Sequence, residues 1–156
     1  MTRWLASLLV ASLSAAPLAA RDSVGIFGDW GAFRDPDIPR CYAIAQAEGG
    51  SGYASVGTWP LRKVRGQFHA RLSSSAPKGG SAVLRIGSRT FSLVIRGNNA
   101  WSRDPKADAA IVAAMRSANS MTVSFRDTSG KRVRDSYRLP GVATALDAAT
   151  VACARR

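Results

Sequence analysis

The chain has 156 residues, with 22 Lys and Arg against 10 Asp and Glu and a formal net charge of +12. This length is enough for one domain with a hydrophobic core and too short for two ordinary domains. The single histidine, the two cysteines and the dispersed acids do not match the ligand spacings of zinc or calcium sites, so we expect no metal and no cofactor.

Residues 1–20, MTRWLASLLVASLSAAPLAA, have the three-part layout of a secretory signal peptide. The cation Arg3 precedes an apolar run, and small residues follow up to Ala20. The run is too short and too interrupted by serine to span a bilayer permanently. A buried amino-terminal helix is the alternative, but no polar residues alternate to give an amphipathic face. We therefore expect cleavage after Ala20, no transmembrane span afterwards, and a single β-sandwich domain over residues 21–156.

Short strands separated by turns are predicted along the first half of the remaining chain. They cover Ile26–Arg34, Arg40–Gln46 and Tyr53–Trp59. The first two are separated by DPDIP, whose prolines prevent ladder hydrogen bonds and indicate a loop. After Pro60, a further strand is predicted in which hydrophobic and cationic residues alternate. Its core face has Val64, Phe68, Ala70 and Leu72, and its solvent face has Arg65, His69 and Arg71.

The segment SAVLRIGSRTFSLVIRG predicts a β-hairpin with Gly87 and Ser88 as the two turn residues. Gly87 can adopt the positive φ that a type II′ turn requires at its first central position. In this register Leu84 faces Phe91 on the core side of the sheet, while Arg85 lies on the other side. The hairpin therefore has one apolar face and one mostly polar face.

Two helices are predicted in the second half of the chain. The first is capped by Asp104, has Pro105 at its first position, and ends where Asn119 can adopt a left-handed conformation. The second lies in the tail GVATALDAATVACARR, in which apolar residues recur at helical spacing up to Cys153. Both helices therefore have an apolar face for packing against a sheet.

A second hairpin is predicted from Met121–Arg126 and Arg132–Leu139. Asp135 falls on its apolar face, which indicates an edge or a bulge. Its solvent face has Arg132, Arg134, Ser136 and Arg138. Many short strands with regular turns favour a mainly β fold, a β-sandwich or barrel with one internal helix and a short C-terminal helix.

Four blocks of the sequence carry a resemblance to a known family. They are FGDWGAFR, RCYAIAQ, NNAWSRDPKADAAIVAAMRSANSMTVSF and DSYRLPGVATALDAATVAC. With these blocks the chain resembles the invasion-associated locus B family of exported bacterial proteins over residues 26–153. The resemblance implies a secreted, immunoglobulin-like β-sandwich without known catalytic residues. The family is named for a role in the entry of a bacterial pathogen into host cells, which makes a role in virulence or host interaction one expectation.

Cys41 and Cys153 are the only two cysteines of the chain. Export places them in an oxidising compartment, and two cysteines allow a single pairing, so we predict a disulfide between them. The alternative is a Cys41 thiol activated by His69, the only histidine, in an exported hydrolase. No GxSxG motif is present and the central region lacks acids, so we predict no catalytic residues and no enzyme.

The stretch from Gly49 to Arg103 contains nine Lys and Arg and no Asp or Glu. Such a surface attracts polyanions. The residues predicted for an anionic partner are Arg62, Lys63, Arg65, Arg71, Arg85, Trp59 and Trp101. The competing interpretation is a solvated strand face, with the tryptophans packed in the core.

We therefore predict a non-catalytic protein of the periplasm or the outer cell surface that binds an anionic envelope component or a host-surface polyanion. Nucleic acid is not an expected partner of an exported protein. The sequence does not indicate whether the protein is a monomer or an oligomer. Two hypotheses remain beside this one. They are the hydrolase that uses Cys41 and His69, and a structural envelope protein whose charge serves solubility and loose association with anionic lipids.

Overall fold

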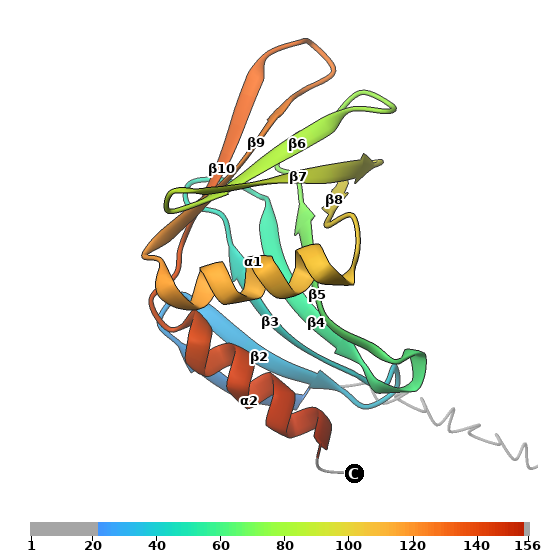
Figure 1. The fold of residues 1–156 in the computed structure, drawn as a ribbon, viewed down its shortest axis with the longest axis vertical. Helices are drawn as coiled ribbons and strands as arrows, with labels where there is room; N and C mark the ends of the chain where they lie inside the picture. Colours follow the sequence, from blue (N-terminus) through green and yellow to red (C-terminus); the bar gives the residue numbers. More distant parts are fainter. Residues whose placement is uncertain (1–21, 155–156) are drawn as a thin grey trace, which may run out of the picture.

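A computed structural model describes residues 22–154 and shows a mainly β protein with two α-helices (Figure 1). The predicted signal peptide, residues 1–20, lies outside the described residues. The first five strands are β1 (Asp22–Phe27), β2 (Trp30–Asp35), β3 (Arg40–Gln46), β4 (Tyr53–Trp59) and β5 (Val64–Arg71). The others are β6 (Ser81–Ile86), β7 (Arg89–Arg96), β8 (Asn99–Trp101), β9 (Ser120–Arg126) and β10 (Arg132–Arg138). The helices are α1 (Pro105–Ser117), α2 (Val142–Ala154) and the short 3-10 helix η1 (Pro60–Arg62).

All ten strands belong to one antiparallel sheet in the order β1-β2-β3-β4-β5-β8-β7-β6-β9-β10. The second half of this sheet, from β8 to β10, crosses over the first, and α1 and α2 lie on the concave side (Figure 1). Helix α1 packs on β5, and α2 packs on β1, β2 and β3. Both halves of the sheet and both helices contribute to one hydrophobic core. The predicted mainly β, sandwich-like fold with one internal and one C-terminal helix is confirmed.

The hairpin of β6 and β7 has the predicted register, in which Leu84 pairs with Phe91 and Arg85 with Thr90. Gly87 has a φ of 56°, as its place in the turn requires. Leu84 is fully buried. The alternation of apolar and polar residues therefore sets both the pairing and the face that packs on the core.

The predicted strand Ile26–Arg34 is wrong, because a turn at Gly28 and Asp29 divides it into β1 and β2. Gly28 has a φ of 60°, and a Cβ there would lie 2.6 Å from the backbone oxygen of Pro140. The turn is therefore set by a close approach between two backbone segments that are far apart in the sequence. Trp30, fully buried, donates from Nε1 to the backbone oxygen of Arg138 at 2.8 Å beside this contact.

The predicted face assignment is also wrong at the start of β5, where a β-bulge interrupts the pairing with β4. Trp59 pairs with Val64 and Gly57 with Gln67, so Thr58 alone faces two residues of β5. The extra residue changes which side of the sheet each earlier residue occupies. Val64 therefore lies on the outer side with Trp59, and Arg65 lies on the concave side.

Helix α1 begins as predicted, with the Asp104 side chain accepting a hydrogen bond from Ala107 N at 2.8 Å. Its predicted end is wrong. Ala118 has an extended conformation and β9 begins at Ser120, so no left-handed Asn119 is formed. The reason is that the chain passes directly from the helix into a strand, and Asn119 O accepts from Leu139 N at 3.0 Å.

The predicted edge position of Asp135 is confirmed, since β10 is the last strand of the sheet. The carboxylate is buried and accepts hydrogen bonds from Ser73, from the backbone N at 3.0 Å and from the hydroxyl. A carboxylate on the apolar side of β10 therefore fastens the end of β5 to the opposite edge of the folded sheet.

Candidate functional site: two cationic surfaces

The cations that the sequence predicted as one surface occupy separate places in the fold. Arg62, Lys63 and Arg65 lie in and beside the turn between β4 and β5, where Trp59 ends β4. Arg85 lies on β6, three strands away from β5 in the sheet. A spacing of about 4.8 Å between strands separates these two places by roughly 14 Å across the sheet. The predicted surface is therefore divided, and Arg71 and Trp101 lie apart from both places, on the outer side of β5 and β8 beside His69.

The first cationic surface lies on the outer side of β6, β9 and β10. We call it the arginine–hydroxyl face and define it by Arg85, Arg126, Arg132, Arg134, Thr122, Ser124 and Ser136, which line one shallow groove of about 740 Å³. The sheet register brings these side chains together, because Arg85 pairs with Thr122, and Ser124 pairs with Arg134. No Asp or Glu lines this groove in the described part of the chain.

The arginines of this face are exposed and have no carboxylate partner. The ion pairs among residues 22–154 involve Arg40, Arg116 and Arg138, none of which belongs to the face. Arg126 and Arg132 are direct cross-strand neighbours, an arrangement of like charges that destabilises a sheet. Arg126 Nη1 donates only to the backbone oxygen of Gly130, at 2.9 Å. An anion bound here would relieve this repulsion.

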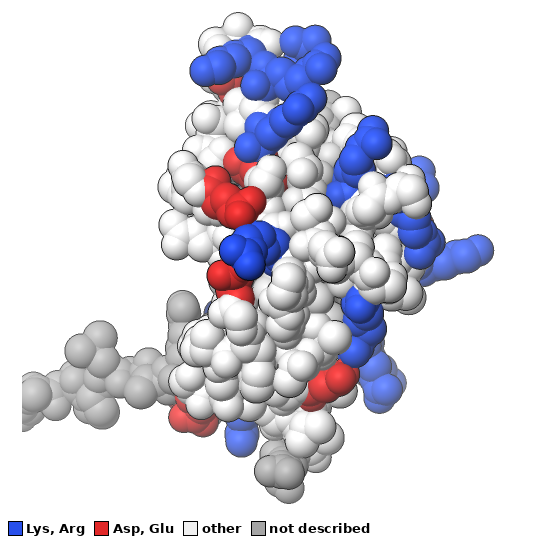
Figure 2. All heavy atoms as spheres, turned by 90° about the vertical axis from the view of Figure 1, so that its left-hand side faces the viewer, with Lys and Arg blue, Asp and Glu red and all other residues white. Residues whose placement is uncertain are grey.

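Asp127, which directly follows Arg126 in the sequence, accepts hydrogen bonds from its own loop. Its Oδ1 accepts hydrogen bonds from the Ser129 hydroxyl, from Ser129 N and from Lys131 N. These bonds, the Ser129 hydroxyl first, lower the pKa of Asp127. Figure 2 shows Lys and Arg covering much of the upper end of the molecule, where the β9–β10 hairpin lies. The charge of this end is therefore mainly positive.

The second cationic surface is a groove between the two helices on the concave side of the sheet, which we call the interhelical groove. Its volume is about 680 Å³. Its lining residues are Cys41, Val56, Thr58, Pro60, Lys63, Arg65, Gly66, Ala109, Val112, Arg116, Leu146, Ala149, Thr150, Cys153 and Ala154. Most of these side chains are apolar or small, so the groove has an apolar floor with cations at its margin.

Two backbone irregularities place Lys63 and Arg65 at this groove. Lys63 has a φ of 55° and is the only non-glycine residue with a positive φ within residues 22–154. This left-handed conformation ends η1, where Lys63 N donates to Pro60 O at 3.1 Å. The bulge puts Arg65 on the concave side, and Gly66 N donates to Thr58 Oγ1 at 3.1 Å. Strained backbone of this kind is common where a side chain must be aimed at a site.

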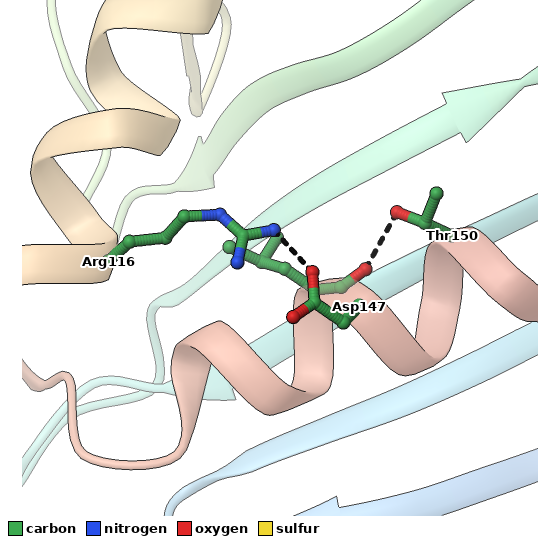
Figure 3. Close-up of polar contacts among 4 residues, drawn as sticks. Arg116, Asp147 and Thr150 are labelled. Atoms are coloured by element: carbon green, nitrogen blue, oxygen red, sulfur yellow. Dashed lines mark hydrogen bonds and ion pairs between the residues drawn. The ribbon is translucent and has the colours of Figure 1, made fainter.

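Arg116 differs from the other two cations of the groove, because it has a carboxylate partner. It extends from α1 to α2, where its Nη2 lies 2.6 Å from Asp147 Oδ1 (Figure 3). This hydrogen bond lowers the pKa of Asp147. One turn later on α2, the Thr150 hydroxyl donates to Leu146 O at 2.8 Å (Figure 3). The Arg116–Asp147 pair therefore links the two helices and leaves Lys63 and Arg65 as the unbalanced charges.

The predicted disulfide between Cys41 and Cys153 is confirmed, with an S–S distance of 2.07 Å and a Cα–Cα distance of 5.7 Å. It joins β3 to α2 in the wall of the interhelical groove. Both cysteines are thus oxidised, and Cys41 has no thiol to act as a nucleophile.

The structure does not bring Cys41 and His69 together as a dyad. Cys41 pairs with Thr58 of β4, whereas His69 pairs with Ser55 of the same strand. Positions 55 and 58 differ by an odd number, so their side chains point to opposite faces of the sheet. Cys41 is buried on the concave side, and His69 lies on the outer side.

His69 is the centre of a polar and aromatic cluster on the outer side of β5. Its Nε2 lies 2.8 Å from Asn99 Oδ1, its Nδ1 lies 3.3 Å from Ser55 Oγ, and its ring centroid is 4.2 Å from that of Trp101. Burial lowers the pKa of His69, and the nearby Arg71 acts in the same direction, against the hydrogen bond with Asn99. Trp101 therefore packs on the imidazole of His69, apart from Trp59 at the end of β4.

The part of the chain that the structure describes contains no group of three or more His, Cys, Asp or Glu side chains arranged to hold a metal ion. Among its helices, none is long and apolar enough to cross a membrane.

Fold and site together define a mainly β, disulfide-linked protein with two cationic surfaces. The family model described as "Invasion associated locus B (IalB) protein" matches residues 85–150, from β6 into α2. The resemblance to this family is therefore confirmed over residues 85–150. No curated protein matches the chain, and no solved structure does.

The sequence predicted that Arg132 and Arg134 lie on a solvent face. It did not predict that these two arginines and Arg126 belong to a candidate site. Their partner in this site is Arg85 on β6, which becomes their neighbour only through the pairing of β6 with β9. These two strands are more than thirty residues apart in the sequence. The available signal was the alternation of arginine with serine and threonine on adjacent predicted strands.

Proposed function

We propose that this is a non-catalytic exported protein of the invasion-associated locus B type that binds an anionic polysaccharide through its arginine–hydroxyl face. The observation that carries the proposal is the set of four exposed arginines among serine and threonine hydroxyls, without a carboxylate in the groove. Guanidinium groups bind sulfate, phosphate and carboxylate in bidentate fashion, and hydroxyls add hydrogen bonds to the sugar. A shallow polar face suits a polymer that lies along it.

The proposed polysaccharide is either a component of the bacterial envelope or a polymer of the host surface, and both have the same anionic chemistry. Export is supported by the layout of residues 1–20 and by the disulfide, which forms in oxidising compartments. The absence of catalysis is supported by the oxidised state of Cys41 and by the position of His69 on the other face of the sheet. These two observations argue against the hydrolase.

The experiment is a titration of the oxidised protein with heparin and, separately, with purified lipopolysaccharide, at increasing salt. We expect binding that weakens steeply with ionic strength, because exposed charges are screened over about 10 Å at 0.1 M salt. The double variant Arg85→Gln/Arg134→Gln should bind about tenfold more weakly, a loss of roughly 1.4 kcal/mol. The two polymers distinguish the host surface from the envelope as the source of the partner.

The matched control is Lys63→Asn/Arg65→Gln, which removes the same charge at the interhelical groove. Asparagine is chosen because it tolerates the left-handed conformation of Lys63. This control should keep its affinity for the polymer. The proposal fails if the wild-type protein binds neither polymer at low salt, or if the control loses as much affinity as Arg85→Gln/Arg134→Gln.

A further inference from the structure

The interhelical groove combines two unbalanced cations with a floor that is mostly apolar, whereas the lining of the arginine–hydroxyl face has Pro77, Val83 and Phe125 among its hydroxyls. The floor of the interhelical groove includes Val56, Val112, Leu146 and Ala149, contributed by β4, α1 and α2. A volume of about 680 Å³ lies within the range of about 300–1,000 Å³ that is usual for pockets that bind small molecules. Binding an apolar group there would remove hydrophobic surface from water.

The cations at the margin of the groove favour an anionic group over a neutral one. Lys63 and Arg65 make no ion pair with any residue that the structure describes, while Arg116 is balanced by Asp147. The positive φ of Lys63 and the bulge beside Arg65 are the local irregularities that place both cations at the groove. A regular strand would have put Arg65 on the outer side of the sheet.

We infer that the interhelical groove binds a single-chain anionic amphiphile of the fatty acid class. The acyl chain lies on the apolar floor between α1 and α2, and the carboxylate lies between Lys63 and Arg65. A guanidinium can bind a carboxylate in bidentate fashion, and an ammonium adds a further charged donor. The Arg116–Asp147 pair closes the space between α1 and α2 beside the acyl chain.

Other occupants fit these features less well. A soluble polyanion would leave the apolar floor in contact with water, and a neutral lipid would leave Lys63 and Arg65 without a partner. A fatty acid matches the floor and the charge together. This inference concerns a site separate from the proposed polysaccharide face and does not depend on it.

The experiment is calorimetric titration of the oxidised protein with dodecanoate below its micelle concentration, with 1-dodecanol as the neutral comparison. We expect saturable one-to-one binding of dodecanoate and binding of dodecanol that is at least about tenfold weaker. The variant Lys63→Asn/Arg65→Gln should weaken dodecanoate binding about tenfold, whereas Arg85→Gln/Arg134→Gln should leave it unchanged.

A second variant tests the floor independently of the charge. Ala109 is exposed on α1 and lines the groove, so Ala109→Trp should fill the groove and abolish dodecanoate binding without disturbing the core. An unchanged thermal transition and the absence of free thiols establish that each variant is folded and oxidised.

The inference is overturned if dodecanoate shows no saturable binding, if dodecanol binds equally well, or if Ala109→Trp binds dodecanoate like the wild type. It is also overturned if light scattering shows a dimer that Ala109→Trp converts to a monomer, because the groove would then be covered by a second copy of the chain.

Discussion

The arginine–hydroxyl face and the interhelical groove both carry positive charge, but they differ in the residues that surround it. The first surrounds Arg85 and Arg134 with serine and threonine on the outer side of the sheet. The second sets Lys63 and Arg65 beside valine, leucine and alanine on the concave side. The positive charge explains why both surfaces attract anions. The polarity of the neighbouring residues determines which class of anion binds tightly. A polymer is expected on the polar face, and an amphiphile is expected in the apolar groove.

The two surfaces also differ in how the chain builds them. The face results from regular alternation along paired strands, in which every second residue points outward. The groove depends on irregular features, which are a bulge, a left-handed lysine, a disulfide and the packing of two helices. Changes that loosen tertiary packing should therefore affect the groove before the face.

The largest expected effect is that of removing the disulfide, which lies in the wall of the groove. Because 112 residues separate the two cysteines, Cys41→Ala/Cys153→Ala should lower the free energy of unfolding by about 4 kcal/mol. Chemical denaturation of the wild type and the variant measures this difference. Below its unfolding transition, the variant should bind dodecanoate more weakly and heparin normally. A loss of stability under about 1 kcal/mol, or a selective loss of heparin binding, would contradict this account of the disulfide.

A smaller effect is expected from Asp108, which fastens α1 over the sheet. Its buried carboxylate accepts hydrogen bonds from Phe68 N at 2.7 Å and from the Ser102 hydroxyl. Asp108→Ala would leave the Phe68 amide unpaired in the core and should cost about 1–3 kcal/mol of unfolding free energy. Asp147→Ala is the control, because it breaks only an exposed ion pair and should cost less than about 1 kcal/mol.

Denaturant titration of these two variants decides whether α1 is held mainly from the sheet or from α2. Equal losses of stability would show that the Arg116–Asp147 pair matters as much as the buried carboxylate. In that case the Arg116–Asp147 pair at the margin would stabilise the groove. The difference in construction between the groove and the arginine–hydroxyl face would then be smaller.

The smallest expected effect concerns pH and the outer side of the sheet. A histidine in an unfolded chain has a pKa of about 6.5. Burial lowers the pKa of His69 in the folded protein, so the fold favours the neutral imidazole. The stability that this preference contributes is therefore complete above about pH 6.5 and is lost as the pH falls below this value toward the lowered folded pKa. Between about pH 7 and pH 5 the wild type should therefore lose more unfolding free energy than His69→Gln. If the wild type and His69→Gln show the same dependence of unfolding free energy on pH, burial of His69 does not lower its pKa in the folded protein.

Alternation along the strands predicted which residues of the face point outward, but not which of them lie together. The sequence of β6 and β7 was sufficient to predict their register and their core side, because hairpin pairing is local. The pairing of β6 with β9 is not local, and it determines that Arg85 lies beside Arg134. Composition alone therefore identified the charge but not its arrangement.

The groove could not be predicted, because each of its walls comes from a different part of the chain. One signal was present in the sequence, since an isolated glycine inside a strand pattern, Gly66, indicates a bulge. That bulge reversed the predicted sides of Val64 and Arg65. Asp135 gave a similar signal on β10, but its partner Ser73 lies 62 residues away and only the folded sheet brings them together.

The most direct test of the central claim is a single comparison of two variants that have lost equal charge, each titrated with heparin and with dodecanoate. Arg85→Gln/Arg134→Gln should bind heparin about tenfold more weakly and bind dodecanoate with unchanged affinity. Lys63→Asn/Arg65→Gln should bind dodecanoate about tenfold more weakly and bind heparin with unchanged affinity. This crossed result would show that two cationic surfaces select different anions. If both variants lose both ligands to the same extent, net charge alone governs binding and the distinction between the surfaces is wrong.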